Sequence, residues 1–187
     1  MDDAPTTKQD ILERNRRAAD AIDRVLAELT DEQLLAAPPD GGWSARDVLA
    51  HLGADVRWMS AQLAAALEGR APTELEAFGT EDPPPAGADL STQDGRNAAQ
   101  HERYRHLPLD EVRATWARYR DHIAGLIERI PDDQFAVSHT FAPLGHLGHV
   151  RPAAEGEEGW PLWRWLAGNT WYHFEDHLAD FEAARGR

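Results

Sequence analysis

Apolar residues recur with the period of an α-helix in four long segments of the chain. These segments run from about Thr7 to Leu29, from Ser44 to about Leu67, from Asp110 to Ile130 and from Pro161 to Ala184. Within each segment the apolar positions fall three and four residues apart, which places them on one face of a helix. The pattern predicts four amphipathic helices that bury their apolar faces against one another, and a shorter helix over about 92–105.

Capping signals support two of these helix starts. Ser44 with Asp47, and Thr6 with Gln9, have the spacing of a capping box, in which each side chain satisfies a free backbone N–H of the other. Pro161 suits the first turn of the last helix, where no backbone N–H is needed. A short turn is expected over 30–35.

Two long stretches carry no helical period. Glycine, proline and acidic residues dominate 70–90 and 132–159, and no window alternates with period two for long enough to indicate a strand. The sequence therefore predicts an all-α helical bundle with two long loops, built as a single domain over residues 1–187. Loops of this length are expected to be binding lids or partner surfaces.

Composition narrows the classes of function. The chain carries 33 acidic against 19 basic residues, a formal charge of −14, which argues against nucleic acid and an anionic membrane surface as partners. It contains no cysteine, so thiolate ligands and cysteine nucleophiles are excluded. The acidic start has no signal-peptide pattern, and no apolar run approaches the roughly 18 residues of a membrane span. We therefore expect a cytoplasmic protein.

The candidate chemistry lies in three histidines. His173 and His177 are four residues apart on a predicted helix, so both imidazoles share one face, and His51 lies on another predicted helix. Three histidines around one divalent metal leave a coordination position open for water or substrate. Asp55 and Asp180 are candidates to accept the other ring N–H and orient two of the rings. The alternative is a hydrogen-bonded pair of surface histidines without metal.

A substrate pocket has weaker candidates. Tryptophans crowd the start of the last predicted helix, and Trp171 together with Trp58 could wall an apolar pocket. His146, in the 132–159 loop, could close over it as a general acid or base. The alternatives are core or dimer-interface tryptophans and a solvent-exposed loop histidine.

Three short motifs in register resemble one known family. The segment 43–52, WSARDVLAHL, resembles the opening of the second helix in the DinB/YfiT-like superfamily, where Trp-Ser is followed after a short gap by His-Leu. The pair His173 and His177 matches the family's His-x-x-x-His on its last helix, and the 29–34 turn is also similar. The run 169–173, NTWYH, is similar to the ClbS/DfsB-like branch.

The resemblance carries its own expectations. It implies an up-down-down-up four-helix bundle whose matching histidines, His51, His173 and His177, bind a divalent metal, often zinc or nickel. Characterised relatives are thiol-dependent transferases and isomerases that use bacillithiol, mycothiol or glutathione. The ClbS/DfsB-like branch instead opens a cyclopropane in a genotoxin by hydrolysis. Both are detoxification chemistry, with a thiol as nucleophile in one branch and water in the other.

Three hypotheses follow for this chain. The first is a metal-dependent detoxification enzyme that activates a low-molecular-weight thiol or water against a small electrophile. The second is a non-catalytic bundle that sequesters a small ligand between its tryptophans, and the third is a helical dimer with a structural role. The sequence leaves open the substrate, the metal, the thiol and whether the chain forms a homodimer.

Overall fold

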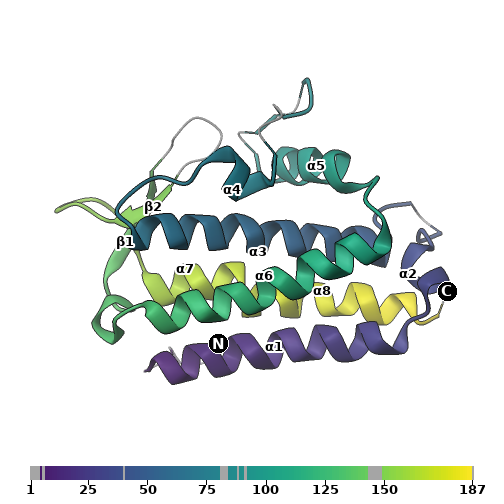
Figure 1. The fold of residues 1–187 in the computed structure, drawn as a ribbon, viewed down its shortest axis with the longest axis horizontal. Coiled ribbons are helices and arrows are strands. Elements are labelled where there is room, and N and C mark those ends of the chain that lie inside the picture. The colour runs from purple at the N-terminus through teal and green to yellow at the C-terminus, as the bar shows by residue number, and fades with distance from the viewer. Residues whose placement is uncertain are drawn as a thin grey trace.

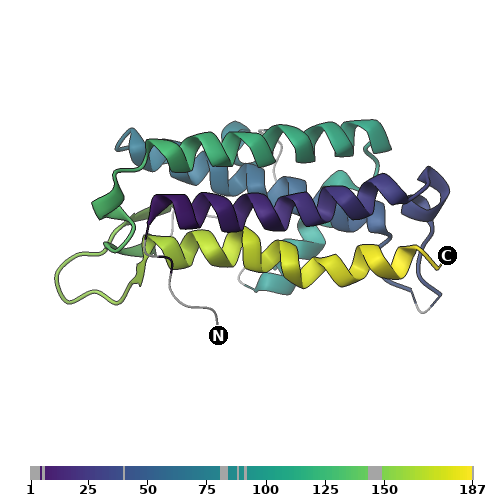
Figure 2. The same ribbon diagram turned by 90° about the horizontal axis from the view of Figure 1, so that it is seen from below.

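Long helices lying side by side form the body of the protein. In this computed structural model the residues described are 5, 7–39, 41–80, 84–87, 89–90, 92–142 and 149–186, without the side chains of 141, 142 and 149. The long helices pack along one another in Figure 1, and Figure 2 shows α1 beside the α7–α8 pair. They are α1 (Lys8–Glu28), α3 (Ala45–Leu67), α6 (Leu109–Arg129), α7 (Leu162–Asn169) and α8 (Trp171–Ala184).

Shorter elements connect and cover these helices. α4 and α5 lie along the outer side of α3, above the other long helices in Figure 1. The shorter helical elements are α2 (Asp31–Leu35), α4 (Glu74–Phe78), α5 (Gln93–Tyr104) and the 3-10 turn η1 (Asp132–Gln134). The strands are β1 (Ser138–Ala142), β2 (His149–Pro152) and β3 (Trp160–Pro161).

The predicted apolar faces are buried. The inward stripe of α3, which includes Val48, Leu52, Val56 and Leu63, is at most 4% exposed. Residues from α1, α3, α6, α7 and α8 contribute to one continuous hydrophobic cluster. α3 packs against α4, α5, α6 and α8 and is therefore buried on most of its sides. This central position matters because α3 carries His51.

Local capping decides where the helices begin. The Ser44 side chain accepts a hydrogen bond from the Asp47 backbone N–H, and the Asp47 carboxylate accepts one from Ser44 N–H, so the predicted capping box is confirmed. The prediction for α1 is wrong by one residue. Thr7 is the N-cap there and accepts from the Asp10 backbone N–H at 3.1 Å, while Thr6 lies outside the described residues.

The stretch 132–159 is not an irregular loop throughout, which corrects the expectation of an all-α chain. β1 pairs antiparallel with both β2 and β3, in the order β2-β1-β3. Strands of five residues or fewer are too short to display a clear period of two, and their pairing depends on distant contacts. One such contact is the hydrogen bond from the Val150 backbone N–H to the Gln62 side chain of α3, at 3.2 Å.

The last helical segment is interrupted, where the sequence predicts one continuous helix over 161–184. Thr170 separates α7 from α8 with φ −127° and ψ −101°, outside the helical region. Its buried hydroxyl donates to the Leu166 carbonyl at 2.7 Å, which removes the need for a partner elsewhere. The stretch 70–90 is likewise not loop throughout, because it contains α4 with a capping box at Thr73.

Among the described residues, no helix combines the length and apolar character that a membrane crossing requires.

Candidate metal centre

The three predicted histidines come together. His51 lies on α3, and His173 and His177 lie one turn apart on α8. Each offers one ring nitrogen, and these three atoms all lie within 4.8 Å of one another. The ring centroid of His51 lies 5.1 Å from that of His173 and 5.2 Å from that of His177, and the His51 ring is nearly perpendicular to both. We call this group the three-histidine cluster.

His51 is held by a residue that the sequence analysis did not single out. Its Nδ1 lies 2.8 Å from Oε1 of Gln100 on α5, and the Gln100 amide nitrogen donates to Oδ1 of Asp55 at 2.5 Å. Asp55, which the sequence suggested as an acceptor of the free ring N–H, is not the partner of Nδ1, because Gln100 occupies that position. The other carboxylate oxygen of Asp55, Oδ2, instead lies 3.4 Å from Nε2, the second ring nitrogen of His51. Nothing in the polar sequence around Gln100 distinguishes it.

His177 has a carboxylate partner on its own helix. Its Nδ1 lies 2.8 Å from Oδ2 of Asp180, three residues further along α8. A carboxylate only accepts hydrogen bonds, so Nδ1 carries the hydrogen at this contact, and in that tautomer the lone pair lies on Nε2. Asp180 therefore orients the ring with Nε2 available as a ligand.

His173 presents a buried nitrogen without a hydrogen-bond partner. Its Nε2 lies 3.1 Å from Oδ2 of Asp55, but the two groups are not aligned for a hydrogen bond, and no other described group bonds this atom. The nearby Asp55 carboxylate compensates part of the cost of burying this atom, and a coordinated metal ion would compensate more of it. Together with two neighbouring imidazoles, this nitrogen fits a divalent metal such as zinc or nickel.

The electrostatics favour the protonation states that a metal requires. Burial lowers the pKa of His51 below its usual value, against the opposing effect of the Asp55 carboxylate, so its ring is neutral near pH 7. Burial raises the pKa of Asp55, but the His173 and His51 rings and the Gln100 amide outweigh it and hold that pKa below its usual value. The site therefore combines a neutral imidazole with an ionised carboxylate.

The three substrate-pocket candidates are placed differently. Trp58 on α3 is partly buried, and its ring centroid lies 6.4 Å from that of Trp165 on α7. Trp171 is 1% exposed and belongs to the hydrophobic core, where its Nε1 has no hydrogen-bond partner in the described part of the chain. His146 lies outside the described residues.

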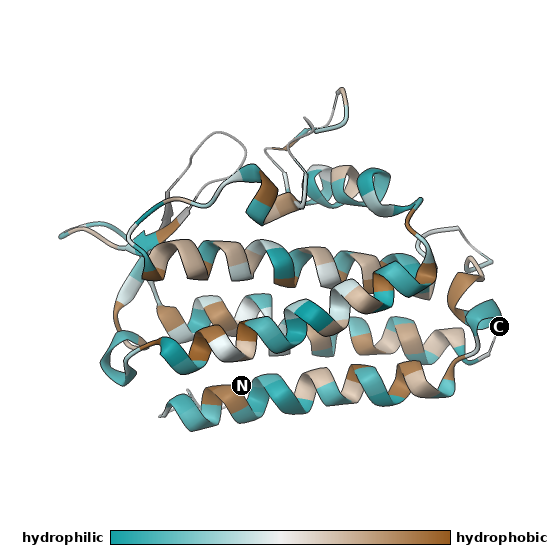
Figure 3. Ribbon diagram, viewed as in Figure 1, coloured by the Kyte–Doolittle hydropathy of each residue, from teal (hydrophilic) through white to brown (hydrophobic). Residues whose placement is uncertain are grey.

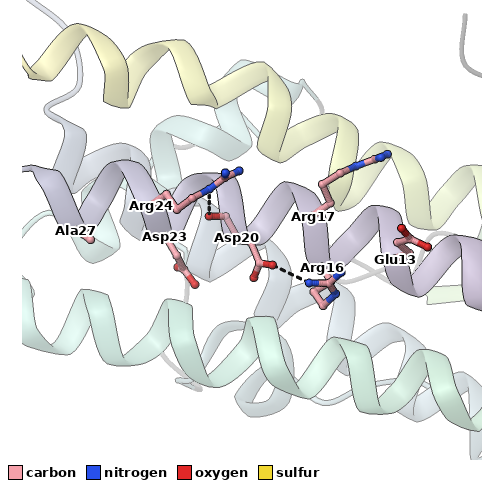
Figure 4. Close-up of a pocket in the computed structure, with 7 residues that line it drawn as sticks. All are labelled: Glu13, Arg16, Arg17, Asp20, Asp23, Arg24 and Ala27. Carbon is pink, nitrogen blue, oxygen red and sulfur yellow. Dashed lines mark hydrogen bonds and ion pairs between the residues drawn. The ribbon is translucent and has the colours of Figure 1, made fainter.

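A larger hollow lies elsewhere, on the outer face of α1. It has a volume of about 600 Å³, and its lining residues all belong to α1, among them Arg16, Asp20 and Arg24. Figure 4 shows these side chains fanning out from one helix, with Asp20 bonded to its helix neighbours. The three-histidine cluster takes no part in this hollow.

Solved structures share the fold across nearly the whole chain. DfsB, described as the sibling lethal factor precursor, matches with a TM-score of 0.69 and 15% identity, covering 98% of this chain and 97% of its own. ClbS, the colibactin self-resistance protein, solved in complex with a dsDNA, matches with a TM-score of 0.67, 11% identity and 98% coverage of both chains.

A third structure is a histidine-to-alanine mutant of the mycothiol-dependent maleylpyruvate isomerase. It matches with a TM-score of 0.62 and 12% identity, covering 95% of this chain and 61% of that one. At these identities the matches establish the fold alone. A search of curated protein sequences finds no match.

A family model matches most of the sequence. The model is that of the mycothiol maleylpyruvate isomerase N-terminal domain, and it matches residues 15–161. The matched range includes His51 and Gln100 and ends before His173, so the α8 histidines join the cluster on geometry rather than on this match. Motifs, fold and family model agree, and the chain belongs to the mycothiol maleylpyruvate isomerase N-terminal domain family of the DinB/YfiT-like superfamily.

Proposed function

We propose that the protein is a metal-dependent detoxification enzyme in which His51, His173 and His177 hold a divalent metal, with zinc or nickel as the first candidates. The observation that carries the proposal is the convergence of one ring nitrogen from each of the three histidines within 4.8 Å, together with a buried His173 nitrogen that has no hydrogen-bond partner among the described residues. Three protein ligands leave at least one coordination position for an external group, which is typical of catalytic rather than structural sites.

The metal and the protein would divide the chemistry between them. A divalent metal lowers the pKa of a bound thiol or water toward neutrality, which makes that group a nucleophile at physiological pH. The chain supplies the neutral ring of His51, holds the His177 ring through Asp180, and places the Asp55 carboxylate 3.1 Å from His173 Nε2. Asp55 is thereby also in place to accept a proton from an incoming group.

The nucleophile that we propose is a low-molecular-weight thiol, with mycothiol ahead of bacillithiol and glutathione. The support is the family model, which is named for a mycothiol-dependent isomerase, and the similarity to the fold of that enzyme. The electrophile would be a small molecule, and Trp58 with Trp165 offers an aromatic wall for it. Water takes the place of the thiol in the alternative hydrolytic reaction.

Metal analysis of untagged protein tests the site. We expect about one zinc or nickel ion per chain in the wild type, as expected for a single site. We expect almost none in His51→Ala and His173→Ala. His106→Ala is the matched control, because His106 is exposed and lies outside the cluster. Unchanged metal content in both cluster variants would show that the site is assigned to the wrong residues.

Turnover assays separate the two nucleophiles. Metal-loaded protein is incubated with a panel of small electrophiles, with and without mycothiol, and the products are identified by mass spectrometry. Products that carry the thiol, formed by the wild type and not by His51→Ala, support the transferase or isomerase reaction. Hydrolysed products formed without thiol would assign the reaction to water instead.

A non-catalytic ligand-binding bundle is the second candidate. The Trp58–Trp165 pair, at 6.4 Å between ring centroids, is the observation that favours it. It predicts quenching of tryptophan fluorescence by a small apolar ligand, equally with and without metal, and no turnover in any assay.

The frame that we propose for this site is an up-down-down-up four-helix bundle formed by a single domain over residues 1–187. Two observations support it. In Figure 1, α1 and the α7–α8 pair run opposite to α3 and α6, and the hydrophobic cluster draws on all of these helices.

Binding of nucleic acid to this protein needs a direct measurement. The ClbS structure is described in complex with a dsDNA, which counts against excluding nucleic acid for a protein of this fold. The formal charge of −14 opposes such binding. Fluorescence anisotropy with labelled duplex DNA, at low and at physiological salt, decides between the two.

A further inference from the structure

We propose that Gln100 is a positioning residue of the metal centre, through which α5 fixes the orientation of both His51 and Asp55. This inference rests on the proposed metal site and deepens it. Gln100 lies on a helix that contributes no histidine to the cluster. Its side chain bridges two groups of α3, His51 and Asp55, with one hydrogen bond from each end of the amide.

The hydrogen-bond roles in this bridge are determined by elimination. The amide NH₂ of Gln100 faces Oδ1 of Asp55 at 2.5 Å and donates to it. The amide oxygen then faces His51 Nδ1, at 2.8 Å, and because it only accepts, Nδ1 must carry the proton. In the neutral ring the lone pair consequently lies on Nε2, on the side where His173 and Asp55 lie.

The same bridge also orients the carboxylate. Gln100 occupies Oδ1 of Asp55, which leaves Oδ2 directed at the ring nitrogens, 3.1 Å from His173 Nε2 and 3.4 Å from His51 Nε2. The amide of Gln100 thus determines the tautomer of His51, and it also determines which oxygen of Asp55 remains free. Asp180 performs the first of these tasks for His177 from within α8, whereas Gln100 acts from a separate helix.

The position of Gln100 depends on polar anchoring of α5. None of the α5 residues is buried, and the helix is largely hydrophilic in Figure 3. The buried Arg46 guanidinium at the start of α3 donates to the carbonyl of Tyr104, the last residue of α5, and to that of Leu107 just beyond it. The Tyr104 hydroxyl donates to the Phe78 carbonyl. His101 stacks on Trp43 with 5.2 Å between ring centroids. These contacts seat α5 so that Gln100 reaches the site.

Zinc affinity tests the proposal. Gln100→Met keeps the length of the side chain and removes both hydrogen bonds, and Gln100→Ala is the second variant. We expect either change to weaken Zn²⁺ binding by about 10- to 100-fold, the usual effect of losing a partner of a metal ligand. The measurement is competition with a chromophoric chelator. Gln93→Met, an exposed glutamine on the same helix, is the matched control and should leave the affinity unchanged.

A double-mutant cycle separates positioning from packing. If Gln100 acts through Asp55 and His51, the losses of zinc affinity in Gln100→Met and Asp55→Asn should be strongly non-additive. Those of Gln100→Met and Asp180→Ala, which concern different ligands, should add. A Gln100 that only packs α5 against α3 would give additive losses in both cycles, which would overturn the proposal.

The visible spectrum of the Co²⁺-loaded protein provides an independent readout. Its absorption bands depend on the ligand geometry, so they should shift in Gln100→Met and not in Gln93→Met. A wild type that binds neither Zn²⁺ nor Co²⁺ would refute the metal site itself. A wild type that binds both, together with Gln100 variants of the same affinity and spectrum, would refute only the role of Gln100.

Discussion

Two groups of ionisable side chains in this protein are built in opposite ways. The charged face of α1 gathers Arg16, Asp20 and Arg24 around a hollow of about 600 Å³, yet every one of these residues comes from the outer face of a single helix. The pocket that His51 and Gln100 line measures only about 10 Å³, but the three-histidine cluster brings α3 and α8 together, with α5 reaching it through Gln100.

The difference lies in how each group satisfies its polar atoms. On α1, Arg16 and Asp20 form an ion pair one turn apart at 3.0 Å. Their side chains are 70% and 51% exposed, so water solvates the polar atoms that the ion pair does not use. In the cluster, His51 is 4% exposed, and His173 has a buried nitrogen to which no described group is hydrogen-bonded. Burying a polar group costs free energy, so convergence and burial are better indicators of a candidate functional site than cavity volume is.

The largest expected effect concerns the core that supports the cluster. Phe174, next to His173, is fully buried and meets Trp116 of α6 edge-on at 5.1 Å between ring centroids. Phe174→Ala should lower the free energy of unfolding by about 3–5 kcal/mol, the usual cost of truncating a buried aromatic residue. Urea denaturation measures this, with the exposed neighbour Glu175→Ala as control. A small loss would mean that α8 is less tightly packed than the structure indicates.

Metal should stabilise the cluster and not the charged face. At about 100 times its Kd, Zn²⁺ should raise the free energy of unfolding of the wild type by about 2.7 kcal/mol. His173→Ala should lose this gain, and Asp20→Ala on α1 should keep it. Thermal unfolding with and without Zn²⁺ gives the comparison. Equal gains in the two variants would place the zinc-binding residues outside the cluster.

The cap of α3 should affect stability more than metal affinity. Ser44→Ala removes the capping box at the start of the helix that carries His51, and should cost about 1 kcal/mol of unfolding free energy. Because His51 lies two turns further along, in the buried part of α3, zinc affinity should change little. A large loss of affinity in this variant would show that the helix start and the site are coupled.

The smallest effect is expected on α1. Arg16→Ala removes an exposed ion pair between residues one turn apart, which is worth about 0.3–0.5 kcal/mol, and should leave zinc affinity untouched. Denaturation and chelator competition on the same sample measure both quantities. A clear change in zinc affinity would mean that the two groups of side chains are not independent.

Much of the helical frame could be predicted because its signals are local. The apolar stripes of α1, α3 and α6 and the Ser44–Asp47 cap depend on residues within a few positions of one another, and the structure confirms them. The short strands and the break at Thr170 could not be predicted. Pairing of β1 depends on segments far along the chain, and a threonine inside an apolar helical pattern does not by itself indicate a break.

By itself the sequence determined that His173 and His177 share a face, because their spacing matches one turn of a helix, and it singled out His51 through its Trp-Ser context. Only the tertiary structure decided that the three ring nitrogens meet, because that depends on how α3 packs against α8. It also decided that Gln100, rather than Asp55, is the hydrogen-bond partner of Nδ1 of His51. A hydrogen bond across 49 positions leaves no periodic trace, since only the docking of α5 on α3 brings its two ends together.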